Sequence, residues 1–266
     1  MNSPGTMPGH TDTGTAWYVY GVVPADTPAE LLAGVQGVAE TIGIVSDGQL
    51  GAIVSEVPLA QFDDEPLAAN LHDPAWLEFH VLRHDSVLAT VARGVPVVPF
   101  RFGTIYRSER HVRVMLGEHP GLSEALETVR GRVELGVKGF APTGTEEPAG
   151  DHGGAGTSPG RRYLEQKQRM RREAEEREAL LARAAEESHA RLVGIAEAAR
   201  ANPLQPPEAT RREAAMFLNG AYLVRIERED AFRRAVASLE ADLGGSGISF
   251  EVTGPWPAYN FVEVEP

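Results

Sequence analysis

Short hydrophobic runs, separated by polar and turn-forming residues, predict β-strands in the first part of the chain. Residues 17–23 alternate aromatic and β-branched side chains and end at Pro24, which predicts a strand. Apolar runs at 38–45 and 51–57 flank Asp47-Gly48, a pair typical of tight turns. These two runs therefore predict a β-hairpin.

The hydrophobic residues of the next segment, from Asp73 to Gly94, recur with the period of an α-helix. Asp73 is expected to cap a helix that has Pro74 at its first position, and its apolar residues recur at three- and four-residue steps from Trp76 to Val91. Gly94 is expected to close it. Further elements are expected as a proline-flanked strand at 95–100, a helix from Ser108 to about Gly117, and a helix at 123–130.

The second half of the chain mixes strands with longer helices. The expected elements are a strand at 133–140, a helix at 161–200, a strand at 217–226, a helix at 230–243, a strand at 248–253 and a short last strand near 260–264. This order resembles a ferredoxin-like unit with an enlarged first crossover.

The helix expected at 161–200 carries a partial heptad of Ala174, Leu181, Ser188 and Ile195. The stripe is too rich in alanine for a convincing long coiled coil. We expect one end of this helix to pack on its own domain and the other end to be exposed.

The element order predicts an α+β protein with two domains. The first is a mixed α+β domain at 16–131, and the second is a modified ferredoxin-like domain at 132–266 with a long helix. Residues 1–15 are expected to form a disordered tail, and residues 141–160, which are poor in apolar side chains, a flexible insertion.

The amino-acid composition excludes several classes of function for this chain. The 42% of hydrophobic residues allow a sizeable core, and the chain has no cysteine, which excludes disulfides and thiol catalysis. The net charge is −13, and Met1 to Leu82 contain eleven acidic residues but no Lys or Arg, which disfavours nucleic-acid binding. With no secretory signal and no long apolar run, we expect a cytoplasmic protein without a membrane partner.

Few residues have a type and spacing that suggest catalysis or metal binding. His80 and His84 have a spacing that can present two nitrogens to one metal, but no third ligand follows, so two ordinary helix histidines, one capping or pairing with Asp85, are the preferred interpretation. The run Asp63-Asp64-Glu65 is interpreted as a solvated charge run rather than a cation site. No phosphate-binding loop or nucleophile elbow occurs. We therefore expect no enzyme, no metal and no cofactor.

Two segments, 96–106 and 254–261, combine Pro, Gly and aromatic residues around a strand. In a strand, the two rings that flank Arg101 share one face and the guanidinium takes the other. An ion pair within the domain is preferred for Arg101 over a carboxylate clamp. In 254–261 the rings either pin the last strand to the core, which is preferred, or form a partner-facing edge. The candidate fold or partner-interface residues are Phe100, Arg101, Phe102, Tyr106, Trp256, Tyr259 and Phe261.

Several blocks along the chain, in this order and spacing, resemble the gas vesicle protein L/F family (GvpL/GvpF). The blocks are 18–23, 52–58, 76–91, 96–106, 131–138, 221–224 and 254–261. Many relatives have Glu-Trp where this chain has Glu134-Leu135, a change that keeps an apolar residue. Residues 1–15 and 141–160 are not covered by the resemblance.

The resemblance implies an accessory or minor structural protein of gas vesicles. Such a protein is expected to bind the small hydrophobic GvpA-type shell subunit, and other gas vesicle accessory proteins, and to keep the shell subunit from aggregating before assembly. It implies a cytoplasmic, gas-vesicle-associated location and no catalytic residues. The alternative hypothesis is a ferredoxin-like regulatory or small-ligand-binding module, since that fold also hosts sensors. The sequence does not distinguish an L member from an F member.

Overall fold

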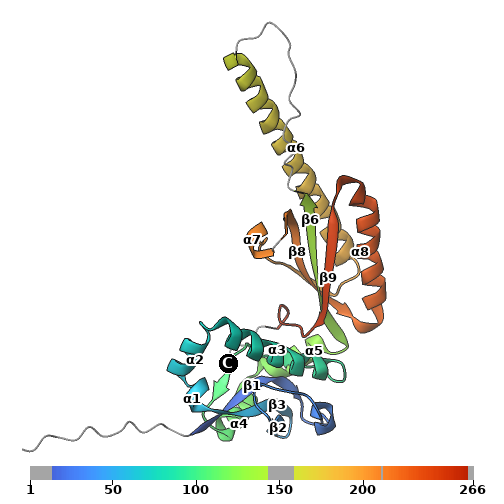
Figure 1. The fold of residues 1–266 in the computed structure, drawn as a ribbon. Helices are drawn as coiled ribbons and strands as arrows, with labels where there is room; N and C mark the ends of the chain where they lie inside the picture. Colours follow the sequence, from blue (N-terminus) through green and yellow to red (C-terminus); the bar gives the residue numbers. More distant parts are fainter. Residues whose placement is uncertain (1–13, 143–158, 211, 263–266) are drawn as a thin grey trace, which may run out of the picture. The chain divides into compact units, whose positions relative to one another are not determined.

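The computed structural model describes residues 14–142, 159–210 and 212–262. It shows a mixed α+β protein with two antiparallel sheets and packed helices, which confirms the predicted fold class (Figure 1). Contacts group the described chain into unit 1, residues 14–133 with 255–262, and unit 2, residues 134–254. The expected tail up to residue 13 and residues 143–158 of the expected insertion lie outside the described residues.

Unit 1 combines one sheet with several helices. Its elements are β1 (Thr15–Pro24), the 3₁₀ helix η1 (Ala29–Leu32), β2 (Gly43–Ser46), β3 (Leu50–Pro58), α1 (Leu59–Phe62), α2 (Asp64–Asn70), α3 (Pro74–Ala92), β4 (Val98–Pro99), β5 (Ile105–Tyr106), α4 (Glu109–Glu118) and α5 (Gly121–Val129).

The sheet of unit 1 has the order β2-β3-β1-β4, and β5 also pairs with β1. The predicted hairpin is confirmed: Asp47 Oδ1 accepts from the N–H groups of Gln49 and Leu50, both at 2.8 Å, and Gly48 takes the left-handed turn conformation at φ +101°. The first hairpin strand begins at Gly43, so the expected start at residue 38 was wrong. The Val38 N–H donates to a tyrosine hydroxyl instead of a strand partner.

The register of β1 against β3 shifts between Val19 and Gly21, which leaves Tyr20 as a bulge. The chain approaches β4 closely at Gly21, where an added Cβ would lie 2.5 Å from the Val98 carbonyl oxygen. The bulge and the glycine together let the edge strand pack against β1.

The strand expected at 95–100 is much shorter than predicted, because only Val98–Pro99 pair with β1. Pro96 and Pro99 lack the N–H that a ladder requires, which limits pairing on this segment. The chain then turns at Gly103, with φ +85°, and returns to β1 as β5.

The predicted helix caps of unit 1 are confirmed. The Asp73 carboxylate accepts from the N–H groups of Ala75 and Trp76 at the start of α3, and Ser108 accepts from the His111 N–H at the start of α4. The core-facing stripe of α3 differs from the prediction, however. It contains His80 and His84 beside three apolar residues, while Leu82, expected on the apolar stripe, is 62% exposed.

Unit 2 is built around a second sheet. Its elements are β6 (Arg132–Pro142), α6 (Pro159–Val193), β7 (Ala198–Ala201), α7 (Pro207–Thr210), β8 (Ala214–Arg225), η2 (Ile226–Arg228), α8 (Glu229–Leu243), η3 (Gly244–Ser246) and β9 (Ser249–Trp256), whose last residues belong to unit 1.

The sheet of unit 2 has the order β7-β8-β6-β9. Helices α6 and α8 contact each other and both contact β8, so they cover the same face. Leu135, Leu192, Tyr222 and Phe232 are among the residues of the core between them.

Two predictions for the second half of the chain were wrong. The long helix ends at Val193, and Ala198–Ala201 form β7 instead of its last turn, antiparallel to residues 220–223 of β8. Asn260 and Phe261, expected in a last strand near 260–264, belong to a turn, Val262 is in no strand, and residues 263–264 lie outside the described residues. As expected, one end of α6 packs on its own unit and the other is exposed: Ala184, Ser188 and Leu192 are buried, and residues 163–176 are exposed.

Candidate interaction surfaces

Aromatic rings and histidines form the centre of unit 1. The Tyr18 hydroxyl lies 2.7 Å from His84 Nδ1, and Tyr20 stacks on the same imidazole with ring centroids 5.6 Å apart. The Tyr20 hydroxyl lies 2.9 Å from Ser55 Oγ and accepts the Val38 N–H at 2.8 Å. These bonds connect β1, β3 and α3 across the interior.

Burial keeps three ionisable groups of this cluster, Tyr18, Tyr20 and His84, neutral. Burial lowers the pKa of His84 to about 4, and an interaction with the Phe100 carbonyl opposes this only partly. His84 Nε2 is buried and has no partner in hydrogen-bond geometry among the described residues. Burial also raises the pKa of both Tyr18 and Tyr20. At neutral pH these three side chains therefore carry no charge and pack as part of the core.

The two helix histidines lie in the core of unit 1, a position that the interpretation as ordinary helix histidines did not specify. His84 pairs with Tyr18 and not with Asp85, while His80 Nδ1 lies 2.8 Å from the Trp76 carbonyl and its ring stacks on that indole. No group of three or more metal-ligating side chains occurs within the described residues. The acidic run at 63–65 is partly structural, because Asp63 caps α2 and pairs with Arg107.

The first proline and aromatic segment faces mainly inward. Phe100 is buried, and Phe102 packs against the core cluster beside Tyr18 with ring centroids 6.0 Å apart. Tyr106 is half-buried in β5, and burial raises the pKa of its hydroxyl. Arg101 is exposed and makes no ion pair with a described residue, so the expected internal pair was wrong: the turn at 101–104 directs its side chain to solvent.

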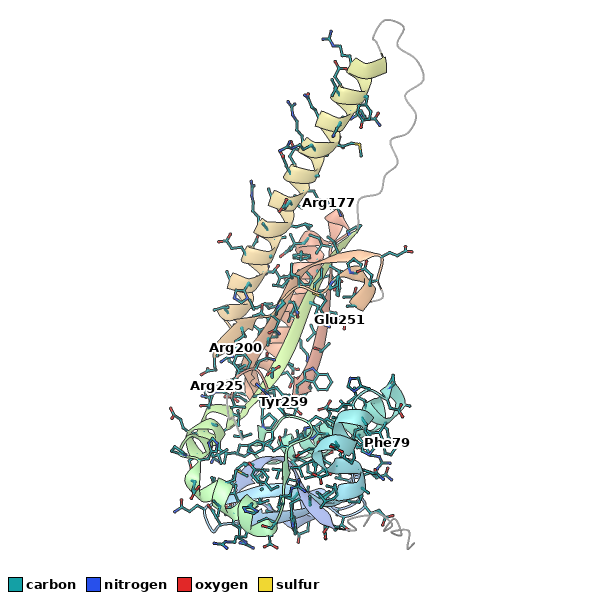
Figure 2. All side chains as sticks on the ribbon, turned by 90° about the vertical axis from the view of Figure 1, so that its left-hand side faces the viewer. Phe79, Arg177, Arg200, Arg225, Glu251 and Tyr259 are labelled. Atoms are coloured by element: carbon teal, nitrogen blue, oxygen red, sulfur yellow. The ribbon has the colours of Figure 1, made fainter. Side chains whose placement is uncertain are left out.

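The second segment lies on unit 1, against α3. The Tyr259 hydroxyl donates to Asp85 Oδ1 at 3.0 Å, and Pro257 and Ala258 are buried. Burial raises the pKa of Asp85, and the bond from Tyr259 opposes this rise. Trp256 and Tyr259 (labelled in Figure 2) are exposed, whereas Phe261 is half-buried. The segment thus has one side toward the unit and one toward solvent.

The outer side of α3 exposes two large apolar side chains, Phe79 at 50% and Leu82 at 62%. Phe79 is labelled in Figure 2. We call this side the α3 surface. The Arg83 guanidinium lies 4.5 Å from the Phe79 ring centroid and donates to the Gly37 carbonyl at 3.3 Å. A hollow of about 440 Å³ beside Phe79 is lined by residues 35–40 and Arg83. This surface was not predicted from the sequence, although Phe79 and Leu82 lie off the stripe of residues 80, 84, 87 and 91.

A second hollow of about 730 Å³ lies beside the edge strand β2. Its lining includes Trp17, Ile44, Glu40, Glu56 and Glu109. Thr15 donates to Glu56 and Arg113 pairs with Glu109, so two of the three carboxylates already have partners.

No helix in the described part of the chain combines the length and apolarity that crossing a bilayer requires. The exposed large apolar residues of unit 2 include Tyr163, Leu164 and Met170, all on the first half of α6. Together with the α3 surface, they are candidates for contact with other proteins.

Comparisons with known proteins agree on one family. The model of the family described as gas vesicle synthesis protein GvpL/GvpF matches residues 16–263. Gas vesicle protein L of a Streptomyces species is 32% identical over 258 residues, covering 93% of this chain and 92% of that protein. Gas vesicle protein F1 of Halobacterium salinarum is 27% identical over 251 residues, with the same shares covered.

Solved structures show the same fold. The crystal structure of GvpF from Anabaena superposes with a TM-score of 0.70 at 18% identity, covering 95% of this chain and 98% of that chain. GvpF from Microcystis aeruginosa gives 0.63 at 17% identity, covering 94% and 99%. The match over residues 16–263 confirms the resemblance seen in the sequence: this chain belongs to the gas vesicle GvpL/GvpF family.

Proposed function

We propose that this protein is an accessory or minor structural protein of gas vesicles that binds the small hydrophobic GvpA-type shell subunit. In this role it acts in the cytoplasm, covers apolar surface of the subunit during nucleation, and prevents premature aggregation. Family membership supports the gas vesicle part of the proposal. Binding to other gas vesicle accessory proteins is compatible with the same role.

The observation that carries the binding part is the α3 surface. Phe79 and Leu82 are one helical turn apart and both project from a helix whose other side is anchored in the ring cluster. A rigid helix with an exposed apolar face suits an apolar helix of a partner. An apolar partner segment would cover side chains that are now half in water.

The size of the expected effect follows from the exposed area. Complete burial of a Phe or Leu side chain contributes roughly 1.5–3 kcal/mol, and about half of each side chain remains to be buried here. The pair therefore contributes on the order of 2 kcal/mol, which is a roughly thirty-fold change in affinity.

The test is co-expression with the shell subunit, followed by measurement of the soluble shell protein that co-purifies. We expect the double variant Phe79→Ser/Leu82→Ser to lose most of the retained shell protein. Val114→Ser, at an exposed position of α4, and Ile226→Ser, at an exposed position of unit 2, are matched controls that should retain it. Circular dichroism confirms that each variant is folded.

Two outcomes contradict the proposal at different levels. If the shell subunit precipitates equally with and without the wild-type chain, shell binding is wrong. If the double variant retains as much shell protein as the wild type, the subunit binds elsewhere, and the aromatic residues Trp256 and Tyr259 become the next candidates. A thermal-shift screen with metabolites and metal ions tests the alternative of a small-ligand module.

We also propose that the two contact units are domains and that unit 2 is a modified ferredoxin-like domain. The order strand, helix, strand, strand, helix, strand runs from β6 to β9, and the sheet order β7-β8-β6-β9 places the first and third strands at its centre. Limited proteolysis that releases a stable fragment close to residues 134–254 would support this division. Degradation without a stable fragment would contradict it.

A further inference from the structure

One guanidinium lies at the edge of the α3 surface without an acidic partner. Arg83 is the first basic residue of the chain, and ten acidic residues precede it between residues 14 and 82. Even so, Arg83 forms no ion pair with any residue that the structure describes. Glu40 lines the same hollow beside Phe79, yet no ion pair joins it to Arg83. The guanidinium is therefore available to an acidic group of another molecule.

The guanidinium of Arg83 is also held in one place. It lies 4.5 Å from the centroid of the Phe79 ring, and it donates to the Gly37 carbonyl at 3.3 Å. These two contacts fix the group and leave most of its N–H donors without an acceptor among the described residues. A guanidinium fixed in this way needs little further ordering to bind a carboxylate, whose two oxygens match its planar fork.

The charge adjoins a stripe of residues along the outer side of α3. Helical geometry places on this side five residues that follow one another at steps of four and three, namely Ala75, Phe79, Leu82, Ser86 and Ala89. The first four are exposed and the last is partly buried. A stripe with this spacing suits packing against another helix. A group that pairs with Arg83 is therefore expected on a helix that runs along α3.

The two flanks of this stripe carry opposite charges. Arg83 lies on one flank, beside residues 35–40. Helical geometry places Glu78 and Asp85 on the other flank, and Asp85 accepts a hydrogen bond there from Tyr259. An acidic residue of a docked helix is attracted on the Arg83 flank and repelled on the Glu78 flank. The α3 surface therefore favours one placement of an acidic residue over the other.

We propose that the segment bound at the α3 surface is an amphipathic helix of the shell subunit with an acidic residue that pairs with Arg83. This inference rests on the proposed function, which supplies the shell subunit as the partner. In the complex, apolar residues of the bound helix cover Phe79 and Leu82 and supply most of the affinity. The same contact removes water from around Arg83, which strengthens the ion pair. Arg83 then determines on which flank the acidic residue of the bound helix lies.

A second copy of this chain fits the same surface less well. Two α3 surfaces in contact would bring together two regions 14–82, each with ten acidic residues and no Lys or Arg. An anionic membrane or a nucleic acid would meet the same repulsion. A helix that carries one carboxylate beside apolar residues meets the guanidinium and the apolar stripe together.

The test is co-expression with the shell subunit, with the co-purified complex washed at low and at high salt. Arg83→Met keeps an aliphatic chain against the Phe79 ring but removes the charge, so we expect roughly three- to tenfold weaker binding at low salt. The difference from the wild type should shrink at high salt, which a purely structural role of Arg83 would not produce. Arg83→Lys should fall between the two proteins. Arg110→Met, at an exposed position of α4, is the matched control and should bind as the wild type.

A charge exchange identifies the acidic residue of the shell subunit. Arg83→Glu should lose most of the retained shell protein, because it places a negative charge beside the docked helix. Each Asp and Glu of the shell subunit is then changed to Arg in turn. One of these changes should restore binding to Arg83→Glu and weaken binding to the wild type. Arg110→Glu makes the same change of net charge away from the α3 surface and should retain the shell protein, and circular dichroism confirms that each variant is folded.

The outcomes separate this inference from the proposed function. If the wild-type chain retains no shell protein, the proposed function is wrong and this inference with it. If Phe79→Ser/Leu82→Ser loses the shell protein but Arg83→Met and Arg83→Glu retain it, the surface stands and the pairing is wrong. Weakening that is independent of salt and that no exchange restores assigns Arg83 a structural role and also overturns the pairing. A wild type that dimerises through Phe79 and Leu82 without the shell subunit assigns the surface to a second copy instead.

Discussion

Acidification should destabilise unit 1 through one buried side chain, His84. Only 2% of this residue is exposed, and burial among Tyr18, Tyr20 and Phe102 lowers the pKa of its imidazole to about 4 from the ordinary 6.5. In the unfolded chain the same imidazole takes up a proton near pH 6.5. Between these values the unfolded state binds more protons than the folded state, so the free energy of unfolding falls as pH falls.

The magnitude follows from the two pKa values of His84. Once His84 is protonated in both states, the free energy of unfolding is lower by roughly 3 kcal/mol. This loss is the free energy equivalent of the difference between a pKa of 6.5 in the unfolded state and a pKa of about 4 in the folded state. At pH 5 about 2 kcal/mol of this loss is already present. The stabilisation is complete above pH 6.5 and is lost progressively as pH falls toward 4.

Urea unfolding at several pH values between 7.5 and 4.5 measures this loss. Tryptophan fluorescence is a suitable signal, because Trp17, Trp76 and Trp256 all belong to unit 1. The reference variant is His84→Gln, which keeps a polar partner for the Tyr18 hydroxyl but does not titrate. His111→Gln, at an exposed position of α4, controls for the loss of a histidine.

The difference between wild type and His84→Gln isolates the contribution of His84. Asp85 acts in the opposite direction, because burial raises its pKa and the folded state takes up that proton first as pH falls, but this effect is common to both proteins. We expect the stability advantage of the wild type to shrink by about 2 kcal/mol from pH 7.5 to pH 5. A pH profile parallel to that of His84→Gln would show that His84 is not a buried neutral imidazole.

Two substitutions test packing in the separate units. Gly21→Ala would place Cβ 2.5 Å from the Val98 carbonyl oxygen, so we expect the free energy of chemical unfolding to fall by about 1–3 kcal/mol. In the control Gly43→Ala the added Cβ meets nothing within 4 Å, so this variant should cost much less stability. Equal losses in the two variants would refute the close approach at Gly21. Ser188→Ala removes a fully buried hydroxyl that has no hydrogen-bond partner among the described residues, so we expect unit 2 to gain up to about 1 kcal/mol; a loss of stability would mean that the hydroxyl is satisfied.

Local signals predicted much of the fold. The turn at Asp47-Gly48 and the helix caps at Asp73 and Ser108 depend on side-chain bonds to nearby backbone, which a few adjacent residues determine. The shortening of the strand near Pro96 and Pro99 could also have been predicted, because proline lacks the backbone N–H that donates a hydrogen bond to a neighbouring strand.

Elements that depend on distant contacts were not predicted. Residues 198–201 continue an Ala-rich helical composition, and only pairing with β8 makes them a strand. His80 and His84 are polar residues that a hydrophobic pattern assigns to the surface, yet ring stacking and the Tyr18 hydroxyl hold them in the core. The assignment of Leu82 to the core stripe of α3 was wrong for the same reason.

The candidate surfaces were harder to predict from the sequence than the fold. The sequence singled out rings at 100–106 and 254–261, and the structure places Phe100 and Phe102 inside and Trp256 outside. Exposure of Phe79 depends on which residues of α3 face the ring cluster, and the apolar pattern alone assigned that face incorrectly. The available signal was that Phe79 and Leu82, both large and apolar, lie off the stripe of residues 80, 84, 87 and 91.

The charge pattern gives these surfaces a physical context. A protein that exposes Phe79 and Leu82 risks associating with itself through them. In the same part of the chain, residues 14–82 contain ten Asp or Glu and no Lys or Arg, so two such regions repel each other at short range. Binding of a partner at the α3 surface depends on apolar contact more than on charge, so high salt should leave it largely intact.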